Sequence, residues 1–316
     1  MRIRAALTVL AACAALIPGL APPAQAAAGL TQVTGFGSNP GALRMYSYVP
    51  AGLPAGRPLI VALHGCTQSA SAYYGNSGWS KYADLYAAAL VFPEQTSANN
   101  ALSCFNWFNA GDIARGRGEA LSIKQMVDFA VARYGSDPRR VYVTGLSAGG
   151  AMTTVMLAAY PDVFAGGAVV AGLPYNCGVI CQYLPQSKTP AQWGQLVRAA
   201  NPGYTGPWPR VAIWHGTADT TVVPANATEL RDQWTNVWGI GQTPAATTTL
   251  PGGTVRESYA TADGRVAVEL DRVPGLGHGA PVDPGGATDQ CGATGAYFLD
   301  SICSSYHIAS FWGLNA

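Results

Sequence analysis

Charged residues are scarce in this sequence. Lys, Arg, Asp and Glu make up 11% of its 316 residues, against about 25% in an average soluble protein. This scarcity excludes a coiled coil, an acidic or basic tail and a disordered chain. No cluster of basic residues could neutralise a row of phosphates, so we expect no nucleic-acid partner. Without Arg2 and Arg4, which lie in a segment that we expect to be removed, 16 basic and 17 acidic residues remain.

The sequence also lacks an apolar run long enough to span a membrane. The longest, residues 5–20, has about 16 residues, whereas a spanning helix needs about 20. This run follows Arg2 and Arg4 and precedes Ala24-Gln25-Ala26, which has the A-x-A pattern of a signal cleavage site. We therefore predict a signal peptide over residues 1–26, secretion of the mature chain 27–316, and no membrane partner.

Cysteine pairs at C-x-x-C spacing are absent. Cys13 lies in the predicted signal peptide, which leaves six cysteines. An even number in an exported chain favours three disulfides. Several connectivities remain open, and nearest-neighbour pairing is the simplest: Cys66–Cys104, Cys177–Cys181 and Cys291–Cys303. Zinc is disfavoured because no C-x-x-C pair occurs and His307, near Cys303, does not complete a ligand set. We predict no metal and no cofactor.

The mature chain has the length and the pattern of one large α/β domain. Apolar, strand-like segments alternate with helical ones, and this order predicts a mostly parallel central sheet with helices on both faces. We find no internal repeat and no Thr/Pro-rich linker, so we expect no separate substrate-binding domain. The predicted strands are 44–49, 58–63, 89–92, 141–144, 167–171, 211–214 and 266–273, and the predicted helices are 119–134, 148–160, 224–237 and 305–312.

The most specific motif is Gly145-Leu146-Ser147-Ala148-Gly149. It has the G-x-S-x-G pattern of a nucleophile elbow and lies between a predicted strand and a predicted helix, which is the context that this turn requires. Small residues on either side let the strand and the helix approach closely. We predict that Ser147 is a nucleophile exposed above the carboxyl ends of the strands.

A serine nucleophile needs an imidazole to accept its proton. The chain has four histidines: His64, His215, His278 and His307. In this type of fold the chain order is Ser, acid, His, which excludes His64, while His215 leaves only Asp162 as an acid between it and the serine. His278 follows a predicted strand in a glycine-rich loop that can place the ring over the sheet edge. We predict His278 as the base and a packing role for His307.

The acid must reach the imidazole from a loop at the same edge of the sheet. Asp219 follows the predicted strand 211–214 within His215–Pro224. Asp271 and Asp283 flank His278 too closely in the chain to oppose it easily. We predict that Asp219 orients His278 and stabilises its protonated form.

Acyl transfer also needs N–H donors for the developing oxyanion. The backbone N–H of Ala148, next to the predicted nucleophile, is one candidate. For the second we choose Cys66, because Gly65 allows a tight turn after the predicted strand 58–63. A Cys66–Cys104 disulfide would hold this donor loop rigid.

Several motifs together resemble one known family. They are His64–Gln68 (HGCTQ), Cys104–Phe108 (CFNWF), Arg115–Glu119 (RGRGE), the elbow at 145–149 and the ending Cys303–Trp312. Across roughly residues 30–316 the chain resembles the esterase family of extracellular polyhydroxybutyrate depolymerases, which also includes feruloyl and acetylxylan esterases. The resemblance implies an α/β-hydrolase fold, secretion, carboxylic-ester hydrolysis, and Ser147, Asp219 and His278 as the catalytic triad.

One departure leaves the substrate open. Depolymerases of this type usually continue into a linker and a substrate-binding domain, whereas this sequence ends at Ala316. Oligomers, amorphous polyester, polylactide-like esters and plant-wall esters all remain candidates. Trp107, next to Cys104 in the sequence, is our candidate for substrate binding; five other aromatic residues either line a groove or pack in the core: Tyr73, Tyr74, Trp79, Phe108 and Tyr175. For Glu119 we expect a helix-dipole role.

We therefore expect a secreted serine esterase whose partner is an ester or polyester of the poly(3-hydroxybutyrate) type, acting as a monomer through an acyl-enzyme. The first alternative is a feruloyl or acetylxylan esterase acting on plant-wall polysaccharides. A secreted acyltransferase with the same triad is more distant. A non-catalytic binding module on the same scaffold is disfavoured, because it would not need Ser147, Asp219 and His278.

Overall fold

A computed structural model of the chain describes residues 29–315. The predicted signal peptide, residues 1–26, lies outside the described residues. Within them, no helix is both long enough and apolar enough to cross a bilayer.

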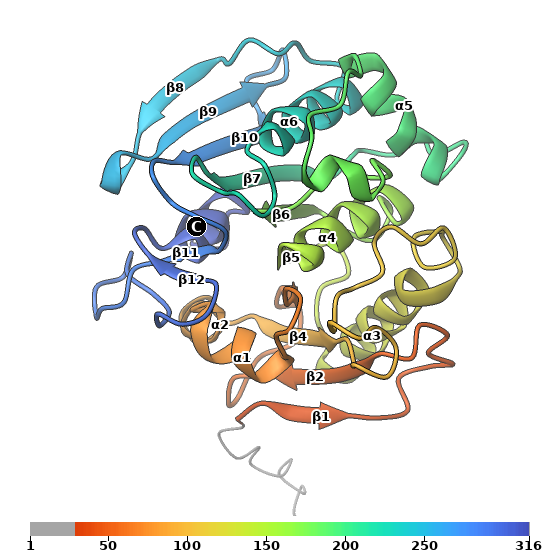
Figure 1. Ribbon diagram of the computed structural model, residues 1–316. Helices are drawn as coiled ribbons and strands as arrows, with labels where there is room; N and C mark the ends of the chain where they lie inside the picture. The colour runs from red at the N-terminus through yellow and green to blue at the C-terminus, as the bar shows by residue number, and fades with distance from the viewer. Residues whose placement is uncertain (1–28, 316) are drawn as a thin grey trace, which may run out of the picture.

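A ten-stranded mixed sheet forms the centre of the molecule (Figure 1). Its strand order is β1-β2-β4-β3-β5-β6-β7-β10-β9-β8. The six strands from β4 to β10 in this order run parallel, and the two strands at each edge pair antiparallel. The strands are β1 (Thr31–Val33), β2 (Arg44–Tyr48), β3 (Leu59–Leu63), β4 (Ala89–Glu94), β5 (Val141–Leu146), β6 (Gly166–Val170), β7 (Arg210–Gly216), β8 (Ala246–Thr249), β9 (Val255–Ala260) and β10 (Val266–Val273); a separate parallel pair comprises β11 (Ala280–Val282) and β12 (Phe298–Asp300).

Helices cover both faces of this sheet, as Figure 1 shows. Residues of α3, α4, α5 and α6 pack in one apolar cluster with alternate side chains of β3. Residues of α1, α2 and α7 pack in a second cluster with the intervening side chains of β3. The helices are α1 (Ala70–Asn76), α2 (Trp79–Tyr86), α3 (Gly118–Tyr134), α4 (Ala148–Ala159), α5 (Pro190–Ala200), α6 (Ala225–Val237) and α7 (Ser304–Phe311), with 3₁₀ turns η1 (Val179–Gln182) and η2 (Pro251–Gly253).

The central elements form where their side chains suit burial on two sides. Every residue of β3, β4 and β5 is buried, which explains their continuous apolar runs. Every residue of α4 is also buried, and its small side chains allow it to pack closely on the sheet. The helix α3 ends at Tyr134, and the next residue, Gly135, has a φ of 66°, in the left-handed region that glycine tolerates.

The structure confirms the predicted alternation and the mostly parallel sheet. It adds elements that the sequence analysis did not predict: β1, β8, β9, β11, β12, α1, α2 and α5. The strands among them are three to six residues long, which leaves little room for a periodic signal. All four residues of β8 are also exposed. The helices α2 and α5 do bury an apolar stripe, with Trp79 and Tyr82 in α2 and Trp193 and Val197 in α5.

Candidate active site

Ser147 occupies a sharp turn between β5 and α4. Its φ of 58° and ψ of −119° place it in a strained region of backbone conformation. A Cβ added to Gly145 would lie 2.4 Å from Gly149, and one added to Gly149 would lie 2.3 Å from the carbonyl oxygen of Leu63. Glycine is therefore required on both sides, because the start of α4 crosses directly over the ends of β3 and β5. This is the local structure predicted from G-x-S-x-G.

Asp219 and His278 lie on loops that leave neighbouring parallel strands. β7 precedes Asp219, and β10, which pairs with β7 in parallel, precedes His278. The N–H groups of Thr217 and Ala218 donate to the carbonyl oxygens of Val273 and Leu276, at 3.0 Å each. These bonds join the two loops at the carboxyl edge of the sheet, although 59 residues separate Asp219 from His278 in the chain.

The structure brings the three predicted side chains together. The His278 Nδ1 atom lies 2.7 Å from Oδ2 of Asp219, and its Nε2 atom lies 2.9 Å from Oγ of Ser147. Because an ionised carboxylate only accepts, Nδ1–H donates to Asp219 and the neutral ring leaves Nε2 free to accept from the serine hydroxyl. This tautomer is the one that a general base for Ser147 requires.

Asp219 is fully buried and has a partner on each oxygen. Its Oδ1 accepts the N–H groups of Thr221 and Val222, at 2.9 Å each. The Nε2 atom of the buried His215 lies 3.5 Å from Oδ2 and 2.9 Å from the carbonyl oxygen of Val222. Burial raises the pKa of Asp219, but the hydrogen bond and the charge of His278, together with the Val222 N–H, outweigh it and hold that pKa below its ordinary value. We interpret Asp219 as a carboxylate. From the chain order, His215 was a candidate only for the base; the structure places it 3.5 Å from the carboxylate of Asp219 instead.

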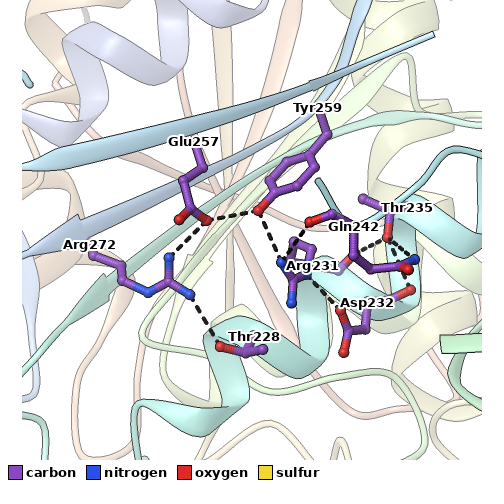
Figure 2. A network of polar contacts seen from close by, with 8 residues as sticks. All are labelled: Thr228, Arg231, Asp232, Thr235, Gln242, Glu257, Tyr259 and Arg272. Atoms are coloured by element: carbon purple, nitrogen blue, oxygen red, sulfur yellow. Dashed lines mark hydrogen bonds and ion pairs between the residues drawn. The ribbon is translucent and has the colours of Figure 1, made fainter. Parts of the chain in front are cut away.

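A polar network fixes α6 to the sheet behind these loops (Figure 2). Arg272, at the end of β10, donates to Glu257 of β9 at 2.9 Å and to Thr228 of α6 at 3.2 Å. Tyr259 donates to the same Glu257 oxygen at 2.7 Å and accepts from Arg231 of α6 at 3.1 Å. The Asp219 loop runs directly into α6, and the His278 loop begins after Val273, the residue that follows Arg272. The network therefore braces the strand and the helix that carry these loops.

Both predicted oxyanion donors border the same cavity as the serine. Cys66 follows β3, Ala148 begins α4, and both line the cavity together with Ser147 and His278. The N–H of Ala148 belongs to the first residue of its helix, so it has no acceptor within that helix. Cys66 is disulfide-bonded to Cys104, and the N–H of the next residue, Thr67, donates to the carbonyl oxygen of Leu102 at 2.6 Å.

Glu119 anchors the loop after β4, which carries Cys104 and is joined to Cys66 by the disulfide. The sequence analysis did not indicate this role of Glu119. Its carboxyl group is buried and accepts from the side chain of Gln95 at 2.5 Å and from the backbone and side chain of Asn106 at 2.8 and 2.7 Å. The backbone N–H of Gln95 in turn donates to Nε2 of His64 at 3.1 Å. Burial raises the pKa of Glu119 to about 8, against the hydrogen bonds that lower it. A lone Glu at a helix start gave no signal of these distant contacts.

The cavity beside Ser147 has a volume of about 270 Å³. Trp107, predicted to bind substrate, lines it; of the other five aromatic residues, Tyr73, Trp79 and Tyr175 are buried in the core. The full lining comprises Gly65, Cys66, Thr67, Gln68, Leu102, Trp107, Leu146, Ser147, Ala148, Leu173, Gln182, Thr221, Val222, His278 and Tyr297.

The remaining sequence predictions concern cysteines and His307. All three nearest-neighbour disulfides are present: Cys66–Cys104, Cys177–Cys181 and Cys291–Cys303. His307 lies on α7 with its ring 5.8 Å from that of Trp214, and burial lowers its pKa to about 4. Residues 29–315 contain no group of three or more His, Cys, Asp or Glu side chains arranged to hold a metal ion.

Comparison with known proteins agrees with this geometry. A family model described as Esterase PHB depolymerase matches residues 43–259. The poly(3-hydroxyalkanoate) depolymerase C of Paucimonas lemoignei is 54% identical over 292 residues, which cover 90% of this chain and 70% of that protein. A feruloyl esterase B of Talaromyces stipitatus is 38% identical over 286 residues, covering 86% and 78%.

The solved structures confirm the fold. An acetyl xylan esterase from Aspergillus awamori superposes with a TM-score of 0.77 at 27% identity and covers 91% of this chain and 100% of its own. The central parallel strands, the turn at Ser147 and the helices on both faces are those of an α/β-hydrolase. The chain belongs to the esterase PHB depolymerase family, and it is a carboxylic-ester hydrolase.

Proposed function

We propose that this protein is a secreted serine esterase that cleaves poly(3-hydroxybutyrate)-type polyesters or their oligomers through an acyl-enzyme. The observation that carries the proposal is the continuous hydrogen-bonded chain from Asp219 through His278 to Ser147, at 2.7 and 2.9 Å, opening on a cavity. Acyl transfer by serine needs each of these three groups in this order.

In the first half of the proposed reaction, Oγ of Ser147 attacks the ester carbonyl carbon as Nε2 of His278 takes its proton. The N–H groups of Cys66 and Ala148 donate to the oxyanion that forms. His278 then gives the proton to the departing alkoxide of the polymer chain, which leaves as a hydroxyl end. The carbonyl carbon stays bonded to Ser147 as an acyl ester.

In the second half, water takes the place of the alcohol. His278 removes a proton from water as its oxygen attacks the acyl carbon, and the same proton returns to Oγ of Ser147 when the bond between them breaks. The product is a carboxylic acid end. Asp219 keeps its charge throughout and stabilises the protonated imidazole in both halves.

The cavity supports a small aliphatic acyl group as the substrate. Leu102, Trp107, Leu173 and Val222 line it, and no Lys, Arg, Asp or Glu does. An apolar lining with a few polar groups is typical of sites for small uncharged ligands. The 54% identity with a depolymerase favours a hydroxyalkanoate over a plant-wall ester. Feruloyl and acetylxylan esters are the second candidates, because relatives with those names share the fold and the family.

The substitution Ser147→Ala tests the mechanism. We expect hydrolysis of p-nitrophenyl butyrate to fall by roughly 10⁴-fold or more, because the nucleophile is lost, while the melting temperature stays within a few degrees. Intact-mass spectrometry of the wild type during turnover should show the butyryl adduct, and Ser147→Ala should show none. Substantial activity in Ser147→Ala would refute the assignment.

Parallel assays test the substrate class. Acid release from amorphous poly(3-hydroxybutyrate), feruloylated xylan and acetylated xylan is measured at equal enzyme concentration. We expect the polyester to be cleaved fastest; a higher rate on either xylan would transfer the proposal to the plant-wall alternative. Sequencing the N-terminus of the exported protein tests cleavage after Ala26.

A further inference from the structure

Large exposed apolar side chains gather around the mouth of the cavity. In the described part of the chain, nine such side chains are exposed, and seven of them belong to segments that supply residues to the cavity lining. We call these seven the apolar rim; they are between 44% and 61% exposed. The apolar rim comprises Leu102, Phe108, Val179, Ile180, Tyr183, Leu184 and Tyr297, whereas Leu85 and Val255 lie elsewhere.

Each part of the apolar rim is connected to the cavity lining. Leu102 and Tyr297 line the cavity themselves, and the ring of Phe108 lies 5.5 Å from that of the lining residue Trp107. The other four flank Gln182, which also lines the cavity and whose carbonyl oxygen accepts the N–H of Val223 at 2.9 Å. Every member of the apolar rim therefore either lines the cavity or lies within three residues of a lining residue in the chain.

The segments that carry the apolar rim are also uncharged. Lys, Arg, Asp and Glu are absent from 65–80, 95–111, 171–187, 273–282 and 291–299, the segments that supply the apolar rim and most of the lining. A soluble protein rarely exposes so many neighbouring apolar side chains without a partner. The partner must be apolar and uncharged, and it must leave a path to Ser147.

We propose that the apolar rim adsorbs the enzyme to the surface of a solid, uncharged aliphatic polyester, with the cavity facing the polymer. This inference rests on the proposed function for the identity of the polymer. Burial of exposed Leu, Ile and Tyr side chains against methyl and methylene groups supplies the attraction, at about 25 cal/mol per Å² of apolar surface. No charge has to be desolvated. A chain end or loop of the polymer can then enter the cavity without the enzyme leaving the surface.

Adsorption is measured without turnover, in the Ser147→Ala background. The protein is mixed with poly(3-hydroxybutyrate) particles, and the depleted supernatant gives the partition constant. We expect Ile180→Glu/Leu184→Glu to lower that constant at least tenfold, and Tyr183→Ser to lower it severalfold. Leu85→Glu is the matched control, because Leu85 is equally exposed on α2 outside the apolar rim, and it should adsorb like the parent. Equal adsorption of rim and control variants would overturn the proposal.

Activity assays of variants that retain Ser147 separate adsorption from catalysis. The Ile180→Glu/Leu184→Glu variant should cleave p-nitrophenyl butyrate within twofold of wild type and lose at least tenfold of its rate on particles. A parallel loss on both substrates would show that these residues serve the site itself, against the proposal. If the wild-type enzyme adsorbs to the particles but never hydrolyses them, the proposed function fails, while the adsorption proposed for the apolar rim stands.

The same variants test two other partners for the apolar rim. If the apolar rim covers a second copy of this chain, light scattering should show a wild-type dimer that Ile180→Glu/Leu184→Glu converts to monomer, which would overturn the proposal. If the partner is a polysaccharide, the Ser147→Ala protein should partition onto insoluble xylan more strongly than onto the polyester, and this result would also overturn the proposal. We expect a monomer and preference for the polyester.

Discussion

Ser147 lies between two pairs of loops that are held in different ways. On one side, the loops of Asp219 and His278 follow the adjacent parallel strands β7 and β10 and are joined by backbone hydrogen bonds. On the other side, the loops of Cys66 and Cys104 follow the adjacent parallel strands β3 and β4 and are joined by a disulfide. The sheet brings the two loops of each pair close together, but hydrogen bonds join one pair and a covalent bond joins the other.

The difference agrees with what each side does in the proposed reaction. His278 binds and releases a proton in each half-reaction, and hydrogen bonds to Asp219 can strengthen and weaken with its charge. The N–H of Cys66 has only to stay in place, and preorganised donors are effective because they need no rearrangement. A covalent bond and the buried carboxyl group of Glu119 provide that fixed position.

The largest effect is expected on the acid–base side. Asp219→Asn should lower kcat by about 10⁴-fold, because the amide NH₂ group can donate to Nδ1 and favour the wrong tautomer of His278. The measurement is hydrolysis of p-nitrophenyl butyrate across pH. A loss of tenfold or less would mean that another group orients His278.

Glu119→Gln tests the other side without touching the disulfide. The new NH₂ group would face the N–H donors of Gln95 and Asn106, so the loop that holds Cys66 should shift. We expect kcat to fall by roughly 10²-fold, as when one oxyanion donor is lost, with little change in KM. A change confined to KM would contradict this role. Glu119→Asp, which keeps a carboxyl group, should recover part of the loss.

Glu119 should also give the protein a pH-dependent stability. Its pKa is raised from 4.5 to about 8 in the folded chain, so between these values the folded state binds more protons than the unfolded state. The free energy of unfolding should therefore decline as the pH rises from about 4.5 to about 8. Urea denaturation at several pH values measures this decline, and it should be shallower in Glu119→Gln; identical slopes would contradict it.

Removal of the disulfide should affect both stability and rate. Cys66→Ala/Cys104→Ala opens a loop with a sequence separation of 38, which corresponds to about 4 kcal/mol of chain entropy. We expect kcat to fall by about tenfold, because the hydrogen bonds of Thr67 and His64 remain. The control is Cys177→Ala/Cys181→Ala, with a separation of 4 and about 2 kcal/mol. A comparable loss of kcat in the control would argue against a special role for Cys66–Cys104.

The smallest effect is expected for the network of Figure 2. Arg272→Gln removes a partly exposed ion pair with Glu257, and such pairs contribute about 1 kcal/mol or less. We expect a slightly lower melting temperature and a change in kcat of less than about threefold, because the backbone bonds between the loops stay in place. A tenfold loss would show that the acid–base side depends on this network as strongly as the other side depends on its disulfide.

Much of the fold is predictable from the sequence because its central elements bury nearly everything. The runs at 58–63 and 141–144 admit few readings other than buried parallel strands, and the chain order of Ser147, Asp219 and His278 restricts the site further. The contacts that a residue makes with distant parts of the chain are not predictable in this way. Glu119 meets Gln95 and Asn106 only because α3 packs below the loop after β4, and no local pattern reports that contact.

Edge elements escaped the sequence analysis for a related reason. The strand β8 has only exposed side chains, so neither the two-residue apolar period of a strand nor the 3.6-residue period of a helix is visible in it. The apolar rim was hidden for the opposite reason: Ile180 and Leu184 look like core residues by type, and only the folded chain shows that they are exposed.

The route of the chain between Asp219 and His278 has a practical consequence. After α6 the chain runs outward to form β8 and then returns through β9 to β10, which lies beside β7 (Figure 1). The hairpin of β8 and β9 thus extends the border of the sheet while the loops of Asp219 and His278 emerge from strands further in. The turn between β9 and β10 has exposed residues at 262–264 and lies at the opposite end of β10 from the His278 loop, so insertions there can lengthen this turn without moving that loop. An engineer who wishes to attach a label or a fused module has a tolerant position there, and natural lineages have room to diversify at the same place.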